Sequence, residues 1–210
     1  MYISRIELDA TRRETLRALA SPSVLHGALE RCFDGERRHP LWRIDMLCGK
    51  VYLLIVSAVP PNLLSIKRQF CLPESAGETR DYTPVLTRIH EDDAMRFRLL
   101  ANPVHRFIEN GVKKIVAHQT PEHQRGWLRS KAQKCGFSLQ DGAFDAVSEG
   151  WKRFRKADGS FVEIKTVAFE GVLTVTDATI LRDALTDGIG RAKAYGCGLL
   201  TLARGNANEQ

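Results

Sequence analysis

The sequence lacks the features that mark membrane, secreted and disulfide-bonded proteins. Its longest apolar stretch, residues 51–61, is about half as long as a membrane-spanning helix needs to be, and the amino terminus has no signal-peptide core. The five cysteines are scattered and form no Cys-x-x-Cys pair, which argues against a zinc ribbon and a disulfide framework. We therefore expect a cytoplasmic protein with reduced cysteines.

The motifs of several common enzyme classes are also missing. None of the six histidines belongs to a His-x-x-x-His or His-Glu-x-x-His pair, so metal catalysis has no support in the sequence. There is no Gly-x-Ser-x-Gly elbow, and the glycine-rich segment 188–198 lacks the spacing of a Walker loop. We expect neither a metal nor a cofactor.

The charge is positive overall but evenly distributed. Lysine and arginine number 31 against 25 aspartate and glutamate, which gives a formal net charge of +6, and residues 1–90 and 91–210 each carry half of it. Such an excess suggests a polyanionic partner without identifying one. With 210 residues and 43% hydrophobic side chains, the chain can build one large or two small domains.

The first 90 residues predict a ferredoxin-like order of strand, helix, strand, strand, helix, strand. Residues 2–8 alternate apolar and polar side chains, as a half-buried strand does. Ser21 and Pro22 have the form of an N-cap followed by proline at the first helical position, which predicts a helix over residues 21–34. The remaining elements are expected as strands at 41–44 and 51–56, the second of them central, a weak helix at 62–67 and a closing strand at 85–88.

An acidic segment at residues 91–93 is the best candidate for a domain boundary. The same order of elements follows it. These elements are a strand at 95–101, a helix capped by Thr120 that ends near residue 135, a strand at 137–139, a long hairpin of 151–156 and 161–175, a helix capped by Asp177 and a strand at 199–202. The fold class is therefore α+β, with two tandem ferredoxin-like domains at residues 1–90 and 91–210.

Three groups of basic residues could bind a polyanion. The outward face of the predicted helix carries Arg125, Arg129, Lys131 and Lys134. The arm of the long hairpin carries Lys152, Arg153, Arg155 and Lys156. The glycine-rich segment combines Gly190, whose backbone can approach phosphate closely, with Arg191 and Lys193. Clustered cations suit a nucleic-acid backbone, but each basic group could equally be a solvated surface and the loop a structural turn.

His26 is the candidate for acid/base chemistry. It lies in the first turns of the predicted helix, beside its apolar stripe, with Ser23 and Glu30 on the same face. A helix start favours phosphate and disfavours imidazolium, so a neutral histidine there could act as a base next to bound RNA. The alternative is an ordinary histidine on a helix surface.

Several segments resemble one known family in order along nearly the whole chain. They are residues 1–6, the helix with His26, and residues 97–103, 167–175 and 188–200. Together they resemble the CasE family, the CRISPR repeat endoribonucleases of type I-E Cascade within the RAMP superfamily. The Phe169-Glu170-Gly171 and Gly188-Ile189-Gly190 blocks are highly specific in combination.

The resemblance implies a function as well as two RAMP-type, RRM-like ferredoxin domains. It implies metal-independent cleavage of precursor CRISPR RNA at the 3′ base of the repeat hairpin. The 2′-hydroxyl attacks and leaves a 2′,3′-cyclic phosphate. The enzyme is then expected to stay on the CRISPR RNA hairpin and to join the other Cascade subunits in antiviral defence.

The resemblance also assigns roles to residues. His26 matches the family's catalytic histidine, whereas Ser23 stands where the family commonly has a tyrosine. A serine hydroxyl is shorter and less acidic than a phenol, so Ser23 suits phosphate contact better than proton transfer. The RNA-binding set is expected to comprise Arg129, Lys131, Lys134, Lys152, Arg153, Arg155, Lys156, Gly190, Arg191 and Lys193.

Two alternatives remain open from the sequence. One is a RAMP subunit that holds the hairpin without cutting it, which Ser23 favours. The other is an ordinary ferredoxin-like protein with a small-molecule or regulatory role.

Overall fold

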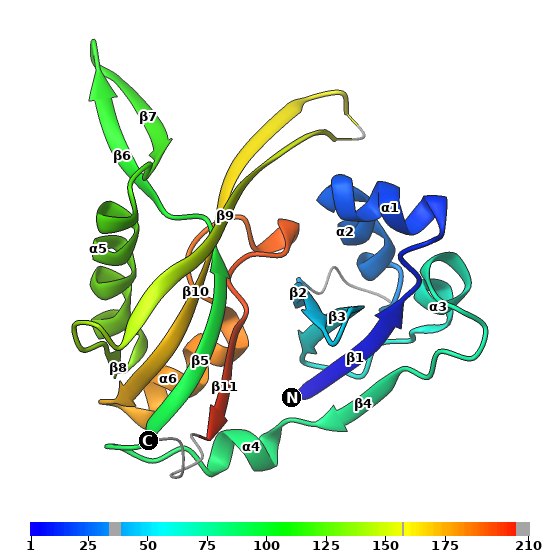
Figure 1. Cartoon of the computed structure of the whole chain (residues 1–210), viewed down its shortest axis with the longest axis horizontal. Coiled ribbons are helices and arrows are strands. Elements are labelled where there is room, and N and C mark those ends of the chain that lie inside the picture. Colours follow the sequence, from blue (N-terminus) through cyan, green and yellow to red (C-terminus); the bar gives the residue numbers. More distant parts are fainter. Residues whose placement is uncertain (34–38, 157, 205–210) are drawn as a thin grey trace.

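Each half of the sequence builds one large antiparallel sheet (Figure 1). A computed structural model describes residues 1–33, 39–156 and 158–204. The first sheet has the order β2-β3-β1-β4. Its strands are β1 (Tyr2–Leu8), β2 (Leu41–Leu47), β3 (Lys50–Ser57) and β4 (Glu78–Asp81).

The second sheet has the order β11-β5-β10-β8, and β9 also pairs with β10. Its strands are β5 (Ala94–Ala101), β8 (Phe137–Ser138), β9 (Phe144–Arg155), β10 (Phe161–Val175) and β11 (Leu200–Arg204). In both sheets the first and third strands of the unit are central and the second and fourth flank them. The predicted α+β class with tandem ferredoxin-like units is therefore confirmed.

Helices of the first half cover one face of the first sheet. They are α1 (Arg13–Ala20), α2 (Pro22–Glu30) and α3 (Leu64–Phe70). Leu25 and Leu29 of α2 are buried in one core with Leu53 and Ile55 of β3. The opposite face of β3 carries Val56, which packs in the core of the second half. Strand β3 is central, as predicted, and its residues 51–56 are apolar because both faces of this part of the strand are covered.

Two elements of the first half differ from the prediction. Residues 85–88 do not form a strand, since they belong to α4 (Thr83–Thr87) and its C-cap. The buried Tyr82, Leu86 and Ile89 follow a helical spacing. The closing strand is β4, which pairs with β1 although all four of its residues are exposed. The strand is paired through backbone hydrogen bonds, so its sequence does not need the alternation of apolar and polar residues by which a strand is predicted.

The helix expected at residues 21–34 is shorter and lacks the predicted side-chain cap. Ser21 lies at the N-cap of α2, but its hydroxyl contacts the Ser23 hydroxyl at 3.0 Å instead of a helix N–H. The helix ends at Glu30, and the predicted stop at residues 34–35 lies outside the described residues. The preceding α1 was not predicted, because only its Thr15 and Ala18 are buried.

The second half contains the predicted helices and one hairpin that the sequence did not reveal. The side chain of Thr120 caps α5 (Pro121–Ala132), and Asp177 caps α6 (Ala178–Asp187). Short 3-10 turns, η1 (Gln133–Cys135) and η2 (Lys193–Tyr195), complete it. The unpredicted hairpin, β6 (Val104–Glu109) with β7 (Val112–Ala117), forms a separate two-stranded sheet.

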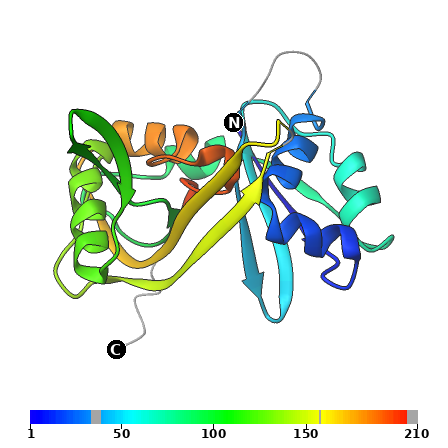
Figure 2. The same ribbon diagram turned by 90° about the horizontal axis from the view of Figure 1, so that it is seen from above.

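The long hairpin is confirmed and begins earlier than predicted, at Phe144. Its outer part, residues 151–156 and 158–166, continues beyond the β5 pairing as a two-stranded ribbon that we call the arm. Residue 157 of the predicted turn lies outside the described residues. Figures 1 and 2 both show the arm reaching from the second sheet to α1 and α2. The arm thus bridges the two halves.

A buried arginine joins the sheets. The Arg43 side chain of β2 is only 2% exposed. Its guanidinium donates two hydrogen bonds of 2.8 Å to the Asp45 carboxylate. Its three other N–H groups donate to the second half at 2.9 Å, and the acceptors are the Arg98 carbonyl, the Leu199 carbonyl and the Thr201 hydroxyl. All five donors are therefore satisfied.

Among the described residues, none of the helices combines the length and the apolar character that crossing a bilayer requires.

Replacing Arg43 by methionine should destabilise the protein strongly. The substitution removes the hydrogen bonds that Arg43 donates to the buried Asp45 carboxylate and to two backbone carbonyls, and Asp45 keeps only the Arg98 guanidinium at 3.3 Å. Removing one partner of a buried ion pair costs about 3–5 kcal/mol. Urea unfolding followed by tryptophan fluorescence measures the loss.

The matched control is Lys50→Met. Lys50 pairs with Glu7 at 3.0 Å on the surface, with its side chain 57% exposed, so its loss should leave the urea midpoint unchanged. Equal midpoints for the two variants would contradict a structural role for Arg43.

Candidate functional site

His26 opens onto a cleft between the two halves of the molecule. The cavity has a volume of about 520 Å³. His26, His39, Pro40 and Leu41 line it from the first half, and Thr186, Asp187, Lys193 and Ala194 line it from the second. Because both halves contribute, the cleft exists only when the two halves are docked.

The imidazole of His26 is held by two neighbours. Its Nε2 lies 3.5 Å from the Glu30 carboxylate, one turn further along α2, and its side chain is 26% exposed. The Tyr195 ring meets it edge-on, with ring centroids 6.3 Å apart at an interplanar angle of 70°. The imidazole is therefore oriented by the protein while part of it remains open to a ligand.

Ser23 lies on the same helical face as His26, but it contacts the arm. Its hydroxyl is 3.0 Å from the Ser21 hydroxyl and 3.5 Å from the Arg155 carbonyl oxygen. The arm therefore reaches the helix that carries His26. Lys152 makes a second contact, because its ammonium donates to the Leu19 carbonyl of α1 at 3.3 Å.

The glycine-rich segment is packed between two tryptophans. A Cβ at Gly190 would lie 3.0 Å from the Trp127 ring, and one at Gly196 would lie 2.9 Å from the Trp42 ring. Both glycines have positive φ, +85° and +83°, which favours glycine on its own account. Gly190 therefore acts in packing, and the segment is a structural turn that also supplies side chains to the cleft.

The side chains of this segment face different surroundings. Lys193 lines the cleft and donates to the Asp187 carbonyl at 2.5 Å. Tyr195 contacts both His26 and Phe154 of the arm, the latter with ring centroids 5.0 Å apart. Arg191 is exposed. Tyr195 has no recognisable role in the sequence, because its proximity to His26 arises only from the fold.

The basic residues of the arm differ in their exposure and in their partners. Lys152 is half-buried against α1, whereas Lys156 is exposed. Arg153 pairs with Glu163 across the hairpin, and its guanidinium lies 5.8 Å from the centre of the Trp151 ring. Arg155 donates to the Gly159 carbonyl at 3.3 Å. The positive charge of Arg153 is thus partly neutralised within the arm.

The basic face of α5 lies apart from His26. Figure 1 places α5 across the second sheet from α2. Arg129 pairs with Asp141 and lies 5.2 Å from the centre of the Phe144 ring, and Lys131 lies 5.9 Å from the Trp127 ring. Lys134 is exposed. The fold therefore brings His26 and Lys193 together in the cleft. It places Ser23 and Lys152 where α1 and α2 meet the arm, and it leaves the α5 residues as a separate surface.

Comparison with known proteins gives consistent results. A sequence model of the family described as "CRISPR associated protein" matches residues 1–204. CRISPR-associated endoribonuclease Cse3 of Thermus thermophilus is 28% identical over 216 residues, covering 97% of this chain and 100% of that protein. CRISPR system Cascade subunit CasE of Escherichia coli is 38% identical over 116 residues, covering 51% of this chain and 56% of that protein.

A solved structure of Cse3 bound to a 19-nucleotide RNA is similar in fold. Its TM-score is 0.82 at 26% identity, covering 97% of this chain and 100% of that chain. The similarity therefore includes both ferredoxin-like units.

The burial of the cysteines, one of which lies in the glycine-rich segment, predicts which thiols react. Burial raises the pKa of Cys197 to about 12 and that of Cys71 to about 11, so both remain thiols at pH 8, and the thiolate is the nucleophile. Cys48, in contrast, is exposed. Iodoacetamide at pH 8 should therefore label Cys48 first and leave Cys197 and Cys71 unlabelled, as measured by peptide mass spectrometry.

Unfolding in urea is the control, since all three thiols should then be labelled. Labelling of Cys197 in the folded protein at the rate of Cys48 would show that the segment is not packed as described.

Proposed function

The chain belongs to the family of CRISPR-associated proteins that includes Cse3 and CasE, and from this membership we propose that it is an endoribonuclease that processes precursor CRISPR RNA. Its partners are the CRISPR RNA hairpin and the other subunits of Cascade. The observation that carries the proposal is a partly exposed histidine, His26, in a cleft that also contains Lys193. We place the reaction in the cytoplasm.

Cleavage proceeds by attack of an RNA 2′-hydroxyl on the adjacent phosphate. The 2′-oxygen forms a bond to phosphorus, the bond to the 5′-oxygen breaks, and the products carry a 2′,3′-cyclic phosphate and a 5′-hydroxyl. This step needs an acceptor for the 2′-hydroxyl proton, a donor for the leaving oxygen and cations near the phosphorane. His26 supplies the acid/base function, and the Lys193 ammonium in the same cleft is positioned to stabilise the added charge.

Ser23 supports the reaction without carrying the proton. Its hydroxyl already contacts Ser21 and the Arg155 carbonyl, so it lies where α2 meets the arm. There it can contact an RNA phosphate and keep the arm against the helix. Lys152 reinforces the same junction through the Leu19 carbonyl.

The RNA stem is held by the exposed cations. Double-stranded RNA is recognised mostly by shape and by phosphate and 2′-hydroxyl contacts, which suits Lys134 of the second half, Lys156 of the arm and Arg191. Arg129 and Arg153 are paired with carboxylates in the free protein. Each therefore binds an RNA phosphate by releasing its carboxylate partner. Lys131 and Arg155 complete the set, and Gly190 contributes through the packing of its loop.

A second candidate is a subunit that holds the hairpin without cutting it. Ser23 favours this alternative because it is a poorer proton carrier than a phenol. The two candidates differ in turnover, since both bind the hairpin but only the enzyme cleaves it.

Substituting His26 by alanine should abolish most of the cleavage. Losing a general acid or base lowers the rate about 10²- to 10⁴-fold, while binding of the hairpin is retained. The measurement is single-turnover cleavage of labelled repeat RNA in EDTA, with Kd determined separately.

The control is His90→Ala, since His90 is an exposed histidine outside the cleft. Equal cleavage by wild type and His26→Ala, or strict dependence on added metal, would contradict the proposed mechanism. Tight binding with no turnover by the wild type over hours would favour the non-cleaving subunit.

Substituting Lys156 by alanine should weaken hairpin binding through the loss of one phosphate contact. The slope of log Kd against log salt concentration should fall by about one. The measurement is hairpin affinity over a series of salt concentrations. Lys50→Ala serves as control, because Lys50 lies on β3 and pairs with Glu7; an equal change of slope in both variants would argue against a contact at the arm.

A further inference from the structure

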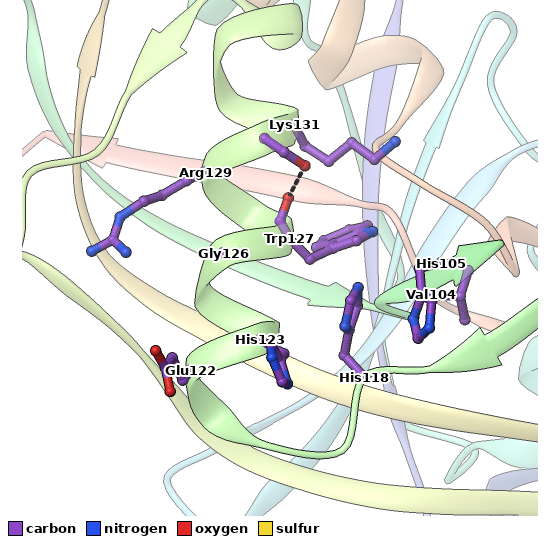
Figure 3. A pocket seen from close by; sticks show the side chains of 10 residues that line it. Val104, His105, His118, Glu122, His123, Gly126, Trp127, Arg129 and Lys131 are labelled. Atoms are coloured by element: carbon purple, nitrogen blue, oxygen red, sulfur yellow. Dashed lines mark hydrogen bonds between the residues drawn. The ribbon is translucent and has the colours of Figure 1, made fainter. Parts of the chain in front are cut away.

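Three histidines lie in a row where the β6–β7 hairpin meets α5. His105 belongs to β6, His118 follows β7 and His123 lies in the first turn of α5. The ring centroids of His105 and His118 are 4.6 Å apart, and those of His118 and His123 are 5.9 Å apart. Figure 3 shows this histidine row beside Trp127, in a cavity of about 580 Å³.

The row is held in place by the backbone around it. The His118 N–H donates to the Pro103 carbonyl at 2.9 Å, and the Gln124 amide donates to the His118 carbonyl at 3.2 Å. The Nδ1 of His123 lies 2.9 Å from the Thr120 hydroxyl, the residue that caps α5. The imidazoles therefore converge because the fold fixes both segments, although 18 residues separate the first from the last.

The charged groups around the row leave it without an anionic partner. In Figure 3 the side chains of Glu122 and Arg129 point away from the three rings, and Lys131 lies on the Trp127 side. On the side of the second sheet, Lys165 pairs with Glu149 at 3.0 Å, and Glu149 also accepts from Gln124. Glu122, which lines the same cavity, is thus directed away from the rings, and Glu149 is already paired.

This arrangement disfavours charge on the row in the free protein. Burial, followed by the neighbouring His105 and His123, lowers the pKa of His118. Three adjacent imidazoles repel one another once they are protonated. An anion placed across them would remove that repulsion, and the N-terminus of α5 beside them also favours an anion.

A metal ion is a poorer fit than an anion. Within the described ranges, no three His, Cys, Asp or Glu side chains are placed to hold a metal ion together. Two cations of α5, Arg129 and Lys131, line the same cavity as the row. We propose that His105, His118 and His123 form a proton-dependent phosphate-binding site for the backbone of the RNA stem. This inference rests on the proposed function.

The site makes RNA affinity depend on pH in a defined direction. Phosphate binding raises the pKa of the imidazoles, so binding takes up protons, and affinity must increase as pH falls. The gain in affinity should be small above about pH 8, where an ordinary imidazole is largely neutral. Uptake of about one proton on binding makes affinity at pH 6.0 at least about tenfold higher than at pH 7.5.

The test uses a repeat hairpin with a 2′-deoxynucleotide at the cleavage position, which the protein cannot cut. Fluorescence anisotropy gives Kd from pH 6.0 to 8.0 in EDTA at constant ionic strength. The triple variant His105→Gln/His118→Gln/His123→Gln cannot titrate, so it should lose the increase at low pH and match the wild type within about twofold at pH 8.0. His90→Gln should behave as the wild type does.

Two single variants guard against misfolding of the triple variant. His105→Gln and His123→Gln replace exposed side chains, and each should remove part of the increase. A pH dependence equal to that of the wild type in all three variants would overturn the proposed site. Failure of the wild type to bind the hairpin at any pH would instead overturn the proposed function itself.

Discussion

The buried guanidinium of Arg43 is the interaction on which the geometry of the molecule depends. It ties β2 of the first sheet to β5 and to the start of β11 through hydrogen bonds that leave none of its donors free. The neighbouring Trp42 points to the other face of β2 and packs against Gly196 of the glycine-rich segment. One strand therefore fixes both the docking of the sheets and the loop that carries Lys193 and Tyr195 to His26.

Much of the fold could be read from the sequence, because ferredoxin-like units bury regular apolar patterns. The central β3, the capped α5 and the long hairpin were all predictable on that ground. The elements that escaped prediction lack a regular pattern of buried apolar side chains. All residues of β4 are exposed, α1 buries only Thr15 and Ala18, and β6 and β7 expose apolar side chains on both strands. Such elements are stabilised by their neighbours in the fold, so their own sequence shows no periodic pattern of apolar residues.

The site was predictable to a similar degree. The helix start and the family resemblance both indicated His26, whose position in a cleft agrees with that role. Tyr195 and the histidine row could not be inferred, since their partners lie far away in the sequence and meet only in the fold. Clusters of basic residues in the sequence were a weaker indication of the RNA-binding surface. Arg129 and Arg153 are neutralised by nearby carboxylates, and Lys152 is directed into the protein.

Strand β10 fixes the spacing between two parts of the second half. Phe169, on which Trp127 of α5 stacks with ring centroids 6.2 Å apart, and Ile164, opposite Lys152, lie on the same strand. Their separation of five residues corresponds to about 16 Å at the rise of a β-strand. Because one continuous strand carries both contacts, the packing surface of α5 and the start of the arm keep a fixed spacing.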